Sequence, residues 1–127
     1  NTFDIYRKKM DGSNTEPVIV EDDFDVTTFS VNKNGTFIVA SKYNNQKSYI
    51  IIWDILEKKI LYQLETTNMG RGLFPSFTED DEYIMFTDGI PDNSSTPRNL
   101  FVMDFECKNL NQITNFSDKI CVRPVSW

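Results

Sequence analysis

The sequence predicts an all-β fold in which a four-stranded unit occurs more than once. The apolar segments are short and rich in Ile, Val, Phe and Tyr, and clusters of Asn, Asp, Gly, Ser and Pro separate them, as is typical of strands and turns. No segment has a convincing 3.6-residue apolar period, which disfavours helices. Parts of the chain also resemble one another at spacings of 46 and 50 residues, which indicates a structural repeat.

Eleven segments combine β-branched or aromatic residues with turn residues at their ends. Taken in chain order, residues 3–8 and 17–20 flank the turn "MDGSN", 26–31 and 37–42 flank "NKNG", 49–54 and 60–64 flank "LEKK", 74–77 and 83–87 flank "TEDD", 100–104 and 111–114 flank "ECKN", and 121–127 ends the sequence. The segment within "YIIIWDI" is apolar in consecutive positions, which predicts a strand buried on both faces.

Two pairs of segments carry the repeat. "SVNKNGTFIVAS" (30–41) aligns without a gap with "SFTEDDEYIMFT" (76–87) at a spacing of 46 residues. "YIIIWDI" (49–55) aligns with "NLFVMDF" (99–105) at a spacing of 50, and the extra residues fall in the loop "DGIPDNSSTPR". Insertions confined to loops are typical of structural repeats. The pattern predicts a partial β-propeller of four-stranded antiparallel blades, with about two and a half repeats.

The repeats resemble those of the TolB-like family, also called PD40 or WD40-like repeats. "DIYRKKMDGSN" and "NLFVMDFECKNLNQIT" resemble the first half of that repeat, and "PSFTEDDEYIMF" resembles the second half. "RPVSW" resembles the beginning of another copy. The whole chain, 1–127, is thus expected to be one partial propeller, with repeat pieces at about 1–20, 21–64, 65–114 and 115–127.

The resemblance implies a non-catalytic protein–protein interaction scaffold of the bacterial cell envelope, in the periplasm or associated with the envelope. The alternative is the propeller domain of a larger prolyl-oligopeptidase-type serine peptidase, where blades gate access to the hydrolase domain. A weaker third reading is a small-molecule site of the lactonase kind. A closed ring of six or more blades needs about 280 residues. We therefore expect either a piece of a longer protein or self-association that completes a ring.

Composition excludes several classes of function. The net charge is −6, and the only basic cluster is at residues 7–9, so nucleic acid is not expected as a partner. Histidine is absent, which removes the usual triads and most catalytic zinc sites. The longest apolar stretch, 49–55, is far shorter than the roughly 20 residues that span a bilayer. We expect no enzyme, cofactor, metal site or membrane span in this chain.

The expected antiparallel order places the longer loops at one end of the blades. This long-loop rim comprises residues 21–25, 43–47, 65–72, 88–98 and 115–119, and the tight-turn rim at the other end comprises the five turns given above. Because longer loops more often carry recognition, we expect other proteins to bind the long-loop rim. The candidate contact residues are Asn68, Arg71, Asp88 and Arg98.

Two pairs of residues raise the questions of calcium binding and of a disulfide. Asp88 and Asp92 could bind calcium weakly, but their spacing differs from that of an EF-hand loop, and a plain polar loop is favoured. Cys107 and Cys121 are expected at opposite ends of strands, roughly 15 Å apart, which is too far for a disulfide.

Overall fold

The structure, a computed structural model, describes residues 2–88 and 97–117. In this part of the chain the regular structure is almost entirely β. The elements are β1 (Ile5–Arg7), β2 (Glu16–Ile19), β3 (Asp25–Val31), β4 (Phe37–Tyr43), β5 (Ser48–Asp54), β6 (Lys59–Glu65), η1 (Thr67–Met69), β7 (Ser76–Phe77), β8 (Tyr83–Thr87), β9 (Leu100–Asp104) and β10 (Asn111–Gln112). The all-β prediction is confirmed, while the strand expected at 121–127 falls outside the described residues.

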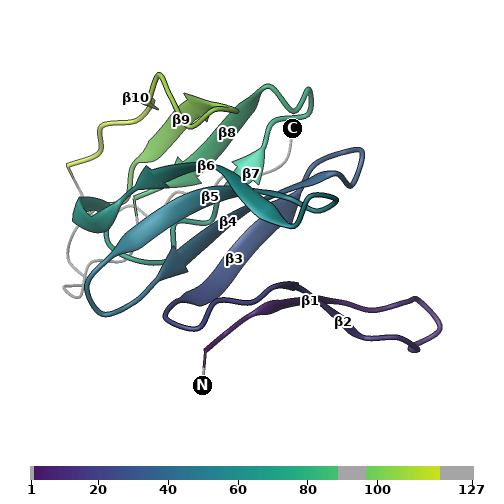
Figure 1. The fold of residues 1–127 in the computed structure, drawn as a ribbon. Coiled ribbons are helices and arrows are strands. Elements are labelled where there is room, and N and C mark those ends of the chain that lie inside the picture. The colour runs from purple at the N-terminus through teal and green to yellow at the C-terminus, as the bar shows by residue number, and fades with distance from the viewer. Residues whose placement is uncertain (1, 89–96, 118–127) are drawn as a thin grey trace.

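The strands form one hairpin and two four-stranded antiparallel sheets. The hairpin is β1–β2, the middle sheet has the order β3-β4-β5-β6, and the last sheet has the order β7-β8-β9-β10. Figure 1 shows the three units arranged in chain order, with the hairpin at one end and the β7–β10 sheet at the other. The first strands of the two sheets, β3 and β7, contact each other.

The internal repeat is visible in the backbone pairing of the first two strands of each sheet. Val31 pairs with Ile38, and 46 residues later Phe77 pairs with Ile84. The turns between these strands also match, because Gly35 N–H donates to Asn32 O, and Asp81 N–H donates to Thr78 O, both at 3.0 Å.

The pairing of the second and third strands repeats with a spacing of 50 for the third strand, because Ile38 pairs with Trp53 and Ile84 pairs with Met103. Ile55 N–H donates to Thr36 O, and Phe105 N–H donates to Glu82 O, each at 3.1 Å. The turns that follow differ in detail, because the Asp54 carboxylate accepts the N–H groups of Leu56 and Glu57, whereas Asp104 accepts the N–H of Lys108. The residues that break the register therefore lie between β8 and β9, in the loop that the sequence alignment indicated.

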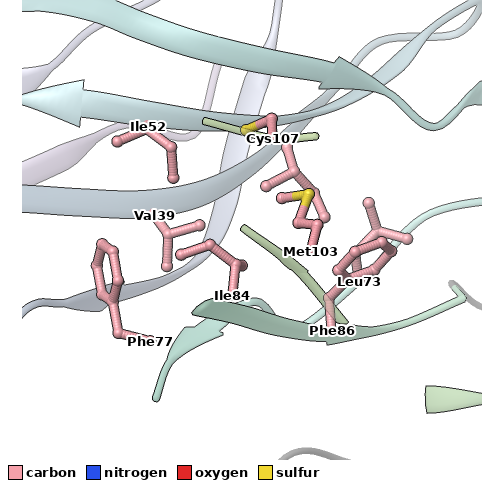
Figure 2. Packing of buried hydrophobic residues seen from close by; sticks show 9 residues of the cluster. Val39, Ile52, Leu73, Phe77, Ile84, Phe86, Met103 and Cys107 are labelled. Atoms are coloured by element: carbon pink, nitrogen blue, oxygen red, sulfur yellow. The ribbon is translucent and has the colours of Figure 1, made fainter. Parts of the chain in front are cut away.

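The middle sheet is buried on both faces. Ile50 and Ile52 belong to a cluster shared with the β7–β10 sheet, while Ile51 belongs to a cluster shared with the β1–β2 hairpin. Figure 2 shows the first cluster, in which Ile52 lies opposite Ile84 and neighbouring side chains. Because buried apolar surface contributes roughly 25 cal/mol per Å², both interfaces stabilise the fold. The prediction of a strand buried on both faces is confirmed.

Three strands are shorter than predicted, for local reasons. Phe74 has a positive φ of 48°, and Pro75 has no N–H to donate, so β7 begins only at Ser76. At the end of β10, the N–H groups of Ile113 and Thr114 both donate to Leu100 O, which ends the regular ladder. At the start of β1, Val26 N–H donates to Phe3 O at 2.8 Å, so Phe3 bonds to β3 and the pairing with β2 begins only at Ile5.

Candidate functional site: the long-loop rim

The antiparallel order brings the expected long loops to one end of the sheets. The connections β2–β3, β4–β5 and β6–β7 leave the strands at this end, as do the described ends of the β8–β9 connection at residues 88 and 97–99. The connections β3–β4, β5–β6, β7–β8 and β9–β10 lie at the other end, on the tight-turn rim.

Asn68 lies on the exposed side of η1. Thr66 N–H donates to Ser48 O at 2.7 Å, and Met69 N–H donates to Thr66 O at 2.8 Å, so the short helix is fixed to the start of β5. No hydrogen bond joins the Asn68 side chain to another residue within 2–88 or 97–117. Its exposed amide therefore keeps both donor and acceptor capacity.

Arg71 follows η1 and lies against an aromatic ring. Its guanidinium carbon is 5.0 Å from the centroid of the Tyr43 ring, at the end of β4. Glycines on either side, Gly70 at φ 79° and Gly72 at φ 68°, allow the sharp path that brings the arginine there. Arg71 is exposed, so this cation–π contact orients the side chain while its N–H groups remain accessible.

Arg98 is buried, with 7% of its surface exposed. Its guanidinium carbon lies 5.6 Å from the centroid of the Phe74 ring. Its Nη1 atom is buried and has no hydrogen-bond partner among residues 2–88 and 97–117. The sequence prediction placed Arg98 among the rim loops, and the structure places it beneath the surface of that rim.

Asp88 lies beside Arg98, so the structure brings these two predicted residues together. Asn99 N–H donates to the Asp88 carboxylate, and Asp88 N–H donates to Asn99 O at 3.1 Å. Burial raises the pKa of the Asp88 carboxyl above its usual value, while the Asn99 N–H and the charge of Arg98 oppose that rise. The Asp88 carboxyl therefore holds its proton more tightly than an exposed aspartic acid does.

Asn99 fixes the strand end next to this pair. Its side-chain oxygen accepts the N–H of Phe116 at 2.7 Å and the hydroxyl of Thr114 at 3.1 Å. Thr114 Oγ1 in turn accepts Leu100 N–H at 2.8 Å. These contacts hold the chain after β10 against the start of β9.

One cluster on this rim was missed by the sequence analysis. Lys42 is 7% exposed, its Nζ lies 2.8 Å from Glu21 Oε1, and it lies 4.6 Å from the centroid of the Phe24 ring. The period of two along β4 could have predicted this burial. Lys42 lies on the same face of the strand as Ile38 and Ala40, which are buried against the hairpin.

The rim thus presents exposed charged and hydrogen-bonding side chains, among them Asn68 and Arg71. Among residues 2–88 and 97–117, no group of three or more His, Cys, Asp or Glu side chains is placed to hold a metal ion.

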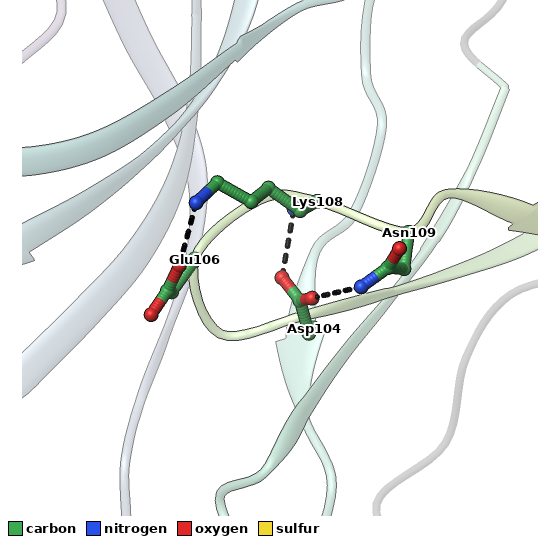
Figure 3. A network of polar contacts seen from close by, with 4 residues as sticks. All are labelled: Asp104, Glu106, Lys108 and Asn109. Atoms are coloured by element: carbon green, nitrogen blue, oxygen red, sulfur yellow. Dashed lines mark hydrogen bonds and ion pairs between the residues drawn. The ribbon is translucent and has the colours of Figure 1, made fainter.

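Cys107 lies on the tight-turn rim, in the turn after β9. Burial and nearby Asp104 raise the pKa of the Cys107 thiol to about 12, which makes it a poor nucleophile. The Asp104 carboxylate accepts the N–H of Lys108 and the Nδ2–H of Asn109, each at 2.8 Å (Figure 3). Asp92 and Cys121, which entered the calcium and disulfide interpretations, lie outside the described residues. No helix in the described part of the chain is both long and apolar enough to cross a membrane.

No family model matches the sequence, and no curated protein matches it significantly. Among solved structures, the chain is similar to TolB from Acinetobacter baumannii, with a TM-score of 0.66 and 16% identity over 87% of this chain and 26% of that chain. It is also similar to a structure from a study of two prolyl endopeptidases, with a TM-score of 0.61 and 11% identity over 90% of this chain and 19% of that chain.

The chain spans about a quarter or less of the length of these two structures. Its two four-stranded antiparallel sheets, packed face to face, match the propeller-type arrangement found in both. The chain therefore has a TolB-like, propeller-type fold, as the resemblance of its repeats predicted.

Proposed function

We propose that this chain is part of a non-catalytic protein–protein interaction scaffold of the bacterial cell envelope, and that partner proteins bind the long-loop rim. The observation that carries the proposal is the fold likeness to TolB over 87% of the chain. It agrees with the repeat resemblance, which implies a periplasmic or envelope-associated scaffold. In this reading the repeat pieces at about 1–20, 21–64, 65–114 and 115–127 are parts of successive blades.

The four candidate residues have different parts in this proposal. Asn68 and Arg71 are exposed and contact the partner directly. Arg98 and Asp88 lie deeper and hold the shape of the rim beneath the contact surface. An exposed arginine on an aromatic ring is well suited to an interface, because it is oriented in advance and loses little side-chain freedom on binding.

A second candidate function is the propeller of a prolyl-oligopeptidase-type serine peptidase, in which the blades gate access to a hydrolase domain. The similarity to a prolyl endopeptidase over 90% of this chain supports it. In that case the catalytic serine belongs to another part of the polypeptide, within a G-x-S-x-G turn.

Site-specific photo-crosslinking in the source cells tests the first proposal. We expect full-length protein with benzoylphenylalanine at position 68 to form one discrete crosslinked product with another protein. The same group at position 57, an exposed glutamate on the tight-turn rim, is the control and should not give that product. Equal products from both positions would contradict binding at the long-loop rim.

A fluorophosphonate probe, which labels active serine hydrolases, separates the two functions. The scaffold proposal predicts no labelling of the full-length protein. Labelling that is lost when the elbow serine is replaced by alanine would support the peptidase and contradict the scaffold.

Self-association that completes a ring also remains a proposal. Sedimentation of the full-length protein at increasing concentration tests it, with a concentration-independent monomer as the contradicting result.

A further inference from the structure

A groove lies between β3 and β7 on the tight-turn rim, at the opposite end of the sheets from the loops considered above. Its volume is about 280 Å³. Val31 and Phe77 provide apolar lining, and Lys33, Glu79 and Asp81 provide charged lining. The two strands that form it, β3 and β7, are the first strands of the two sheets (Figure 1).

Hydrogen bonds of backbone N–H groups hold the walls of the groove in place. Lys33 N–H lies 3.3 and 3.2 Å from the two carboxylate oxygens of Asp81, which joins the turn after β3 to the turn after β7. Asp81 has a φ of 60°, and its own N–H donates to Thr78 O at 3.0 Å. The groove is thus formed before any partner binds, which reduces the entropy cost of binding.

The charge of the groove is mainly negative. Four consecutive acidic residues, 79–82, form the turn on the β7 side. Among the lining residues, Lys33 carries a positive charge, and Glu79 and Asp81 carry negative charges. The Thr78 hydroxyl and the Glu82 N–H donate to Asp80, which lowers the pKa of that carboxyl and keeps it ionised. Glu79 is exposed, and within residues 2–88 and 97–117 its carboxylate makes no hydrogen bond or ion pair.

The apolar part of the groove is also incompletely covered. Val31 is 46% exposed, although it belongs to a strand whose neighbours Ile38 and Ala40 on β4 are buried. Phe77 belongs to the buried core between the two sheets (Figure 2). It also lines the groove. The groove therefore combines apolar lining with the carboxylates of Glu79 and Asp81, which form no ion pair within the part of the chain that the structure describes.

The volume of the groove indicates what kind of chemical group fits into it. Small-molecule sites usually have volumes of roughly 300–1,000 Å³, so this groove is just below that range. It is suited to one or two side chains of a larger partner. The charge favours a cation, and the apolar lining favours an aliphatic stem or an apolar neighbour.

We propose that the β3–β7 groove is a second docking site, which binds a basic segment of a partner protein. An arginine or lysine of that segment contacts Glu79 and Asp81, and an adjacent apolar side chain packs on Val31 and Phe77. This site is separate from the long-loop rim, and it does not depend on the function proposed for that rim.

The test measures binding of two labelled peptides to the full-length protein by fluorescence anisotropy in about 50 mM salt, where screening is weak. The probe is Gly-Leu-Arg-Leu-Arg-Gly, and its acidic counterpart is Gly-Leu-Glu-Leu-Glu-Gly. We expect the basic peptide to bind and the acidic peptide not to bind. Glu79→Gln should weaken binding about three-fold, as expected for loss of one exposed charge contact.

Glu57→Gln is the matched control, because Glu57 is also exposed on a turn of the tight-turn rim and does not line the groove. It should leave the affinity unchanged. Hydrogen exchange should slow at residues 30–33 and 77–81 when the basic peptide is bound. No binding, equal binding of both peptides, equal weakening by the two substitutions, or protection elsewhere would each overturn the proposal.

Discussion

Asn32 shows how one buried side chain fixes a turn. Its side-chain oxygen accepts the N–H groups of Thr36 and Phe37 at 2.8 and 2.9 Å, and its Nδ2 donates to Thr36 Oγ1 at 3.0 Å. In the second unit, Thr78 occupies the equivalent position and its hydroxyl oxygen accepts Tyr83 N–H at 3.1 Å. Two different residues thus stabilise the same turn, which the aligned sequences alone do not reveal.

Replacing Asn32 with alanine should therefore destabilise the fold. We expect Asn32→Ala to lower the free energy of unfolding by about 1–3 kcal/mol, because two backbone N–H groups in part-buried hydrogen bonds lose their acceptor. Urea denaturation measures this change. Asn34→Ala, at an exposed position of the same turn, is the control and should change the stability by less than about 0.5 kcal/mol. Similar losses in both variants would contradict this account.

The buried ion pair of Lys42 and Glu21 predicts strong coupling between the two residues. Lys42→Met or Glu21→Gln alone leaves the other group without its partner, and we expect each to cost about 1–3 kcal/mol. The double variant should cost less than the sum of the two, since no unpaired charge remains. A double-mutant cycle measured by urea denaturation checks this, and additive losses would show that the pair is not coupled.

Asp88 predicts a pH dependence with a defined sign. Because its pKa is raised on folding, the folded protein holds this proton more tightly than the unfolded chain does. The resulting stabilisation is complete at pH values below 3.8, the unperturbed pKa, and is lost as pH rises through the higher folded pKa. The free energy of unfolding of Asp88→Asn, relative to the natural chain, should therefore increase between pH 3 and pH 7.

Asp80→Asn is the matched control for this measurement. The pKa of Asp80 is lowered on folding, so its stabilisation is present at higher pH and is lost as pH falls. The relative stability of Asp80→Asn should consequently decrease between pH 3 and pH 7. Urea denaturation at several pH values gives both trends, and the same sign for the two variants would refute the assignment.

At the scale of elements, β5 has alternate residues in two different cores. Ile52 packs against the β7–β10 sheet, and Ile51 packs against the β1–β2 hairpin. We expect Ile52→Ala and Ile51→Ala each to lower the free energy of unfolding by about 2–4 kcal/mol, since both side chains are fully buried. Leu56→Ala, at a side chain that is 85% exposed, should have little effect.

Thermal or urea denaturation of the three variants provides the measurement. If only one of the two isoleucine substitutions were destabilising, the middle sheet would be covered on one face alone. That outcome would be incompatible with stacked blades.

The elements differ in how far their sequences predict them. The spacing of 46 residues correctly predicts which residues of β3–β4 and β7–β8 are equivalent, because strand register follows the apolar pattern and the turn. The late start of β7 was not predictable, since it depends on the positive φ of Phe74, an aromatic residue that seldom adopts it. η1 is too short to carry a periodic signal.

The candidate site was predictable only as a set of loops. Topology places Asn68 and Arg71 correctly on exposed parts of the rim, because antiparallel order alone decides at which end a loop lies. The depth of Arg98 depends on side-chain packing across the loop that contains Phe74, which sequence spacing does not encode. Whether these residues contact a partner stays a prediction.

At the scale of the whole molecule, the chain corresponds to about a quarter or less of the two solved structures to which it is similar. The middle sheet, with neighbours on both faces, shows the packing that every blade of a complete ring needs. Contact between the first strands of successive sheets, β3 and β7, is the other feature that a ring requires. Both features are present in the part of the chain that the structure describes.

Nuclear Overhauser effects from selectively labelled isoleucine methyl groups test this packing most directly. If the sheets are stacked as blades, Ile50 and Ile52 show contacts to side chains of the β7–β10 sheet, while Ile51 shows contacts to Ile5 and Ile19 of the hairpin. If Ile51 instead shows contacts only within its own sheet and to water, the sheets are not stacked as blades and the propeller-type fold is contradicted.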